Sequence, residues 1–324
     1  MRILRIILVA ACAALFTASA AQAQGSSYPA RPIRLVVTLS PGSSSDILAR
    51  IVAEEMSRSL RQPVVVENRP GAGGNVAGEH VARSAPDGYT LLLASVSSHG
   101  INPAIYARMP YDAVRDFTPV SLLASSPNVL VVKGSGERDL AGLIAAAKAA
   151  PGQLNYSSGG VGTSHHLSGE LLNVLAGVRT EHVPYRGSPE AVTAVQTGEV
   201  AFMFPNAPNA IALADAGELR ILAVTTPRRV SFLPQVPTMI EAGIPGFDVT
   251  AWFGLVAPAR TPTEVVSVLN AAAQQALSSD AVRAKLVAQW FEPIGGTSEE
   301  FSNFMRQEIE RWRGIASSRG ISVQ

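Results

Sequence analysis

The sequence contains one cysteine among its 324 residues, Cys12, which lies in an apolar N-terminal segment. Intramolecular disulfides are therefore excluded, and so is thiol catalysis elsewhere in the chain. Charged residues are also scarce, at 16%, and the 26 Lys+Arg nearly cancel the 25 Asp+Glu to leave a net charge of +1. This balance lacks the basic surface that nucleic-acid-binding proteins carry, so we expect no nucleic-acid partner.

No segment is apolar for long enough to span a bilayer. The apolar run Ile6 to Phe16 follows Arg2 and Arg5 and precedes Ala21-Gln22-Ala23, which fits a small-x-small cleavage pattern. We interpret residues 1–23 as a signal peptide cleaved near Ala23, which would place the mature, cysteine-free protein in the periplasm. A lipoprotein cleavage box that ends at Cys12 is the alternative, and it would leave a lipid-anchored protein.

The most informative pattern is a strand, a small-residue loop and a helix near the start of the mature chain. The apolar, β-branched run 33–39 predicts a buried strand, which Pro-Gly at 41–42 ends. Ser44 or Ser45 can cap the helix that follows, with Asp46 in its first turn. Free backbone N–H groups and three hydroxyls then meet at a helix N-terminus, where proteins commonly bind anions.

The same order of strand, Ser/Gly loop and helix occurs again at 154–175, and a polar loop at 95–99 follows a third strand. In open α/β sheets ligands bind beyond the carboxyl ends of the strands, so these loops predict a binding site. The Gly-rich turn at 71–74 lacks the third glycine of the dinucleotide fingerprint. We interpret it as a turn that permits close backbone approach.

Strands and helices alternate along almost the whole chain, which predicts an α/β fold with mainly parallel sheets. Two long extended segments, 119–132 and 247–258, interrupt this alternation. We interpret them as crossings between two lobes. The first lobe would then comprise residues 24–122 and 248–324, with the second lobe, residues 123–247, inserted between them.

Enzyme signatures are few. Ser164 and His165 are neighbours, and Asp46 or Asp248 could complete a triad, which leaves an exported Ser/His hydrolase as an alternative function. No G-x-S-x-G elbow accompanies them. His165 and His166 cannot chelate one metal as an i, i+4 pair would, because adjacent helical residues point in different directions. We expect no enzyme activity, no cofactor and no metal, and instead a protein that holds a small organic carboxylate on amides and hydroxyls.

Nearly the whole mature sequence resembles the Bug receptors, the substrate-binding proteins of tripartite tricarboxylate transporters, also known as the TctC family. The resemblance rests on Tyr-Pro-Ala-Arg-Pro-Ile-Arg at 28–34, Pro-Gly with Asp46 and Ala-Arg at 41–50, Val-Glu-Asn-Arg-Pro-Gly-Ala-Gly-Gly-Asn at 66–75, Asp-Gly-Tyr-Thr-Leu at 87–91, Gly-Thr-Ser-His-His-Leu at 162–167, Val-Pro-Tyr-Arg-Gly at 183–187 and Ala-Trp-Phe-Gly at 251–254. It implies a two-lobed, Venus-flytrap binding protein that delivers a small carboxylate to transporter subunits in the membrane.

Together with the loops identified above, the resemblance implies a ligand site between the lobes. The first-lobe contacts would be Leu39, Ser43, Ser44, Ser45, Asp46, Ser95 and Ser97. The second-lobe contacts would be Gly162, Thr163, Ser164, His165, Pro205 and Asn206.

Two residues depart from the family pattern. Ser43 stands where a second glycine is frequent, and Pro205 stands where an aspartate is frequent, with Asn206 as its possible substitute. The missing aspartate argues against an amino-acid ligand. We expect a monomer. A solute-sensing partner of a membrane signalling receptor is a further alternative, because the same binding event would serve it.

Overall fold

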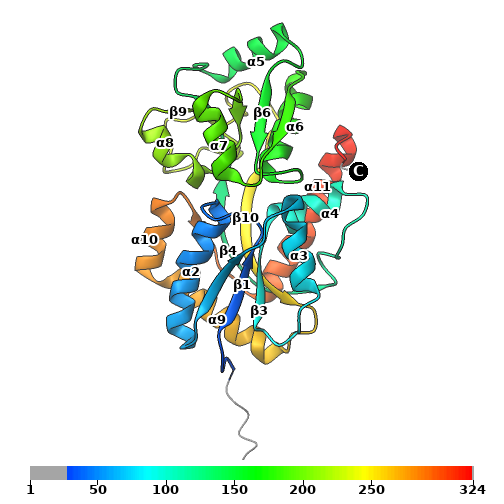
Figure 1. The fold of residues 1–324 in the computed structure, drawn as a ribbon, viewed down its shortest axis with the longest axis vertical. Coiled ribbons are helices and arrows are strands. Elements are labelled where there is room, and N and C mark those ends of the chain that lie inside the picture. The colour runs from blue at the N-terminus through cyan, green and yellow to red at the C-terminus, as the bar shows by residue number, and fades with distance from the viewer. Residues whose placement is uncertain (1–27, 323–324) are drawn as a thin grey trace, which may run out of the picture.

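The structure, a computed structural model, describes residues 28–322. The predicted signal peptide and Cys12 lie outside this range. The chain forms two α/β lobes stacked end to end, with the long strands β4 (Phe117–Pro127) and β10 (Thr250–Pro258) at their junction (Figure 1). Within residues 28–322, no helix combines the length and the hydrophobicity needed to cross a bilayer.

The first lobe is built on a six-stranded sheet in the order β11-β4-β10-β3-β1-β2. Its other strands are β1 (Ile33–Val37), β2 (Val64–Asn68), β3 (Thr90–Ser95) and β11 (Glu292–Pro293). Its helices are α2 (Ser44–Leu60), α3 (Asn75–Ala82), α4 (Asn102–Ile105), α9 (Thr263–Ser278), α10 (Asp280–Ala288) and α11 (Ser298–Arg319). Every β3 residue is buried, because helices cover both faces of the sheet, as in other sheets of this class.

The second lobe is built on a five-stranded sheet in the order β7-β6-β8-β5-β9. Its strands are β5 (Val129–Lys133), β6 (Asn155–Ser158), β7 (Glu181–Pro184), β8 (Phe202–Met203) and β9 (Leu219–Val224). Its helices are α5 (Leu140–Ala149), α6 (Ser164–Ala176), α7 (Ser188–Thr197) and α8 (Ile211–Asp215). A short 3₁₀ turn, Ala207–Asn209, follows β8.

The predicted two-lobed α/β fold is confirmed, but the sheets are mixed and not mainly parallel. β1 pairs in parallel with β2 and β3, whereas β10 is antiparallel to β3 and β4. In the second sheet, β5 is antiparallel to both β8 and β9. The reason is topological: β5 and β10 enter their lobes from the junction, so they run away from it, whereas β1, β3, β6 and β8 run towards it.

The chain passes between the sheets at a small cluster of backbone hydrogen bonds. Thr225 N donates to Asn128 O (3.0 Å), and Val249 N donates to Thr225 O (3.1 Å). The chain leaves the first sheet after Pro127 and rejoins it at Thr250. The lobe boundaries predicted near residues 122 and 247 stay a prediction.

A local prediction for the segment after β3 was wrong. The polar loop expected after β3 is helical: Ser97–Ile101 form a π-helical turn that leads directly into α4. Side chains such as Ser98 satisfy backbone groups there, since Ser98 Oγ accepts from Ser95 N at 3.1 Å.

Several histidines are buried or half-buried and are held in the neutral form. The rings of His166 and His182 lie 4.2 Å apart between centroids, and His182 Nε2 lies 2.6 Å from Ser158 Oγ. Burial lowers the pKa of His166 to about 4, and burial together with the nearby His166 lowers that of His182 to about 3. Burial alone lowers the pKa of His99 to about 3.

These pKa values predict a loss of stability in acid. Between pH 6.5 and about 4 the unfolded chain binds protons on these histidines and the folded chain does not, so the free energy of unfolding falls as the pH falls. The full free energy of unfolding is recovered above pH 6.5. In His182→Gln the free energy of unfolding should fall less steeply with pH, by up to about 1.4 kcal/mol per pH unit, which is the contribution of one proton. Urea unfolding from pH 7 to 4.5 measures both slopes, and equal slopes would contradict the prediction.

Candidate functional site

The loop between β1 and α2 turns most of its polar groups inward. Ser43, and not Ser44 or Ser45, is the N-cap of α2, since its side chain accepts from Asp46 N at 3.4 Å. The Asp46 carboxylate accepts from Gly42 N at 2.9 Å and pairs with Arg50. Burial acts to raise the pKa of Asp46, but these hydrogen bonds outweigh it and the pKa is lowered. The negative charge of Asp46 therefore stabilises its own loop.

The corresponding loop of the second lobe begins α6. Thr163 is the N-cap: its hydroxyl oxygen accepts from His166 N at 3.4 Å and donates to Gly160 O at 2.7 Å. Gly162 N donates to His166 Nδ1 at 3.3 Å, which fixes the loop just before the cap. The first-turn N–H groups of α6 consequently point towards the first lobe, as Ser164 N shows by donating to Ser97 Oγ across the junction at 3.2 Å.

A small cavity lies where these loops face each other. It has a volume of about 10 Å³, which is roughly the space of one water molecule. Both lobes line it, and none of its lining residues in the described chain is Asp, Glu, Lys or Arg. The lining residues are Thr38, Leu39, Ser45, Ser95, Val96, Ser97, Thr163, Ser164, His165, Asn206, Ala251 and Phe253.

A hydrogen-bond chain sets which groups around the cavity donate. Gly159 N donates to His165 Nδ1 (3.2 Å), so the ring proton is on Nε2 and faces Asn206 Oδ1 (3.2 Å). Burial lowers the pKa of His165 to about 4, which keeps this tautomer neutral. Asn206 Nδ2 donates in turn to Asn128 Oδ1 (2.7 Å), and Asn128 Nδ2 to Ser164 Oγ (3.2 Å). Ser164 Oγ also donates to Asn128 Oδ1 at 3.5 Å, so this hydroxyl is bonded to the Asn128 amide in both directions.

The same chain leaves the hydrolase alternative without an activated nucleophile. Both ring nitrogens of His165 are engaged, with Gly159 and with Asn206, and Ser164 Oγ contacts Asn128. Nucleophilic catalysis needs the serine within hydrogen-bond reach of a base. Within residues 28–322, no three His, Cys, Asp or Glu side chains are grouped so as to hold a metal ion.

The structure divides the predicted site residues into two groups. Residues of the first group line the cavity: Leu39, Ser45, Ser95, Ser97, Thr163, Ser164, His165 and Asn206. Residues of the second group lie beside it: Ser43, Ser44, Asp46, Gly162 and Pro205. Thr38, Val96, Ala251 and Phe253 also line the cavity and were missed. Ala251 and Phe253 belong to β10, a strand of the first sheet within the segment 247–258 that was predicted to cross between the lobes. No local pattern indicates which of its side chains reach the cavity.

Backbone groups of the two lobes come very close around this cavity. A Cβ on Gly187 would lie 1.8 Å from Ser40 Oγ, and a Cβ on Gly73 would lie 2.5 Å from Val161 O. The Gly-rich turn was predicted to permit close backbone approach, and the structure confirms this at Gly73. Tyr106 OH also donates to Val161 O, at 3.4 Å. A second cavity of about 380 Å³ opens beside these contacts, between the Gly71–Gly73 turn and Arg186.

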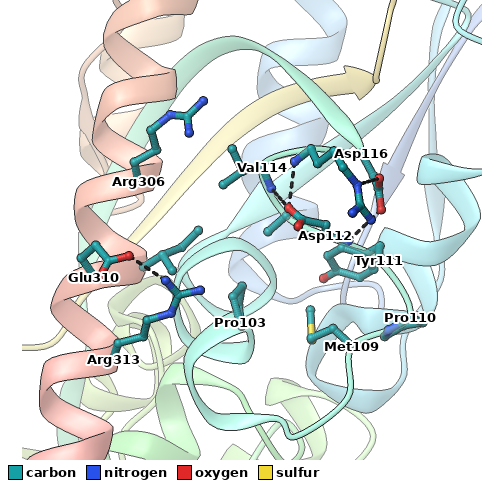
Figure 2. Close-up of a pocket in the computed structure, with 13 residues that line it drawn as sticks. Pro103, Met109, Pro110, Tyr111, Asp112, Val114, Asp116, Arg306, Glu310 and Arg313 are labelled. Carbon is teal, nitrogen blue, oxygen red and sulfur yellow. Dashed lines mark hydrogen bonds and ion pairs between the residues drawn. The ribbon is translucent and has the colours of Figure 1, made fainter.

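A much larger groove lies elsewhere, on the first lobe, with a volume of about 630 Å³ (Figure 2). Its charged groups largely satisfy one another. Asp112 Oδ1 accepts from Arg115 N (2.8 Å), Arg115 pairs with Asp116 (3.1 Å), and Arg313 pairs with Glu310 on α11 (2.6 Å). Size alone therefore does not mark this groove as the ligand site.

Comparisons with known proteins agree with the fold. Residues 48–321 match the model of the tripartite tricarboxylate transporter family receptor. Protein BugT of Bordetella pertussis is 38% identical over 307 residues, 94% of either chain. Two solved structures from Rhodopseudomonas palustris are similar: Rpa4515 with adipate (TM-score 0.88, 38% identity, 91% of this chain and 99% of that one) and MatC with bound malate (0.86, 34%, 89% and 99%). The chain therefore belongs to the tripartite tricarboxylate transporter receptor family, whose members are solute-binding receptors.

Proposed function

We propose that this protein captures a small organic carboxylate between its lobes in the periplasm and delivers it to the membrane subunits of a tripartite tricarboxylate-type transporter. The signal peptide would be removed near Ala23, and the mature receptor would act as a monomer. Family membership supports the receptor role. The adipate and malate named with the two similar structures support the carboxylate class.

One observation carries the ligand class: the cavity collects neutral hydrogen-bond donors from both lobes. Hydroxyls of Ser45 and Ser97 line it from the first lobe, and the first turn of α6 lines it from the second. Such donors suit an anion, because hydroxyls and the N–H groups at a helix N-terminus stabilise negative charge. They also suit a ligand that has to be released again, since no buried opposite charge holds it.

Binding requires the lobes to part. A volume of about 10 Å³ accommodates roughly one water, which is less than a carboxylate group needs. The strands β4 and β10 and the segment at Thr225 are the connections that could flex. We infer a hinge motion there that opens the cleft for entry and closes it over the ligand.

The first test is a thermal-shift screen of residues 24–324 with mono-, di- and tricarboxylates, amino acids and aromatic acids. A ligand that binds only the folded state raises the free energy of unfolding by mass action, by about 2.7 kcal/mol at a hundredfold excess over Kd. The melting temperature rises with it. We expect shifts from one or more non-amino carboxylates. Shifts confined to uncharged solutes or amino acids would refute the proposed class.

The second test changes one cavity-lining residue in each lobe: a hydroxyl donor in the first lobe and the N-cap of α6 in the second. Ser45→Ala deletes a cavity hydroxyl, and Thr163→Pro deletes the α6 cap and the N–H that donates to Gly160 O at 3.3 Å. The φ of Thr163, −75°, suits proline, so the fold should survive. Hydrogen bonds to charged groups contribute about 1.5–3 kcal/mol, so calorimetry should show affinity falling roughly ten- to a hundredfold.

The exposed Ser135→Ala variant is the matched control, and it should bind as the unaltered protein does. Unchanged affinity in both Ser45→Ala and Thr163→Pro would show that the ligand lies elsewhere.

A further inference from the structure

We propose that Asn209 is a closure latch: a second-lobe side chain that binds the N-terminus of α2 when the lobes meet and so sets how readily the receptor closes. Asn209 ends the short turn after β8. Its Oδ1 accepts from Ser44 N at 3.1 Å and from Ser44 Oγ at 2.6 Å. Its Nδ2 donates to Gly42 O at 2.8 Å.

These hydrogen bonds occupy the position where the sequence predicts an anion. Ser44 N is one of the first N–H groups of α2, which have no partner within the helix and carry the positive end of its dipole. An oxygen is expected there from a ligand, from water or from the protein. In this structure the amide oxygen of Asn209 supplies it, so the α2 N-terminus binds the other lobe.

Asn206 reinforces the contact from the same turn, because Ser44 Oγ also lies 3.2 Å from Asn206 Oδ1. On the other side of the loop, Gly187 approaches Ser40, and a Cβ on Gly42 would lie 3.5 Å from Pro189 Cγ. The loop 40–44 is thus enclosed by two second-lobe segments. Asn209 binds this loop through both its amide oxygen and its amide nitrogen.

Asn209 does not line the cavity, so it acts on closure and not on the ligand. Closing the lobes forms its three hydrogen bonds whichever carboxylate is present. The apparent Kd is the intrinsic Kd divided by the fraction of receptor in the binding-competent state. Losing the latch should therefore raise the Kd of every ligand by the same factor. The loss of a cavity hydroxyl should instead change the selectivity among ligands. This part rests on the proposed function.

The experiment measures Asn209→Ala in two ways. Small-angle scattering of the ligand-free protein should show a larger radius of gyration than that of the unaltered protein. Calorimetry with adipate, malate and succinate should show Kd values raised about tenfold by one common factor for every probe that binds. In a double-mutant cycle, Ser44→Ala should cost little further affinity in the Asn209→Ala background, because the two side chains share a hydrogen bond.

Two further variants calibrate the result. Asn303→Ala removes an exposed asparagine on α11 and should match the unaltered protein in both measurements. Gly187→Val is the open reference: its φ of −171° suits any residue, but its side chain would collide with Ser40. The radius of gyration of ligand-free Asn209→Ala should lie between that of the unaltered protein and that of Gly187→Val.

Unchanged scattering and unchanged affinity in Asn209→Ala would overturn the latch. Unequal losses among the probes would instead make Asn209 a ligand contact, which also overturns it. If no carboxylate binds the unaltered protein, the proposed function fails, and the ligand-free scattering still decides whether the latch exists.

Discussion

The structure depends on the close approach of two backbone loops from facing sheets. Loops 40–45 and 159–164 each end a strand and begin a helix, and they meet across a cavity that no charged residue of the described chain lines. Each of these loops is also approached by a glycine of the other lobe: a Cβ on Gly187 would collide with Ser40, and a Cβ on Gly73 would collide with Val161. A bulky or charged loop at either position would hold the lobes apart.

Topology brings these loops together. β1, β3, β6 and β8 point their carboxyl ends at the junction, because the strands that enter each lobe from the junction, β10 and β5, run the other way. Each lobe is therefore a mixed sheet with its polar loops on one edge. The two edges face each other, and the connections that allow this are also the segments at which a hinge could bend.

Burial controls the chemistry of the cleft. The residues that surround it are neutral, and where titratable groups approach, they are kept uncharged or are paired within their own lobe. His165 is held neutral by burial and transmits a fixed donor–acceptor order from Gly159 to Asn206. Asp46 is charged but is bound by Gly42 and Arg50. What faces the cavity is a set of oriented dipoles, which can hold an anion without a buried counter-charge.

The sequence alone determined the alternation of strands and helices, the order of the polar loops and the glycine turn, because hydrophobic period, capping residues and turn residues act over a few neighbours. It also determined the family, since the motifs that carry it are contiguous. Only the tertiary structure decided that Ser43 caps α2, that Ser44 binds Asn209 and that Ala251 and Phe253 reach the cavity. Those contacts either join residues far apart in the chain, as Ser44 and Asn209 are at 165 positions, or choose among equivalent serines. A local pattern contains no information about which partner a hydroxyl or a strand will meet.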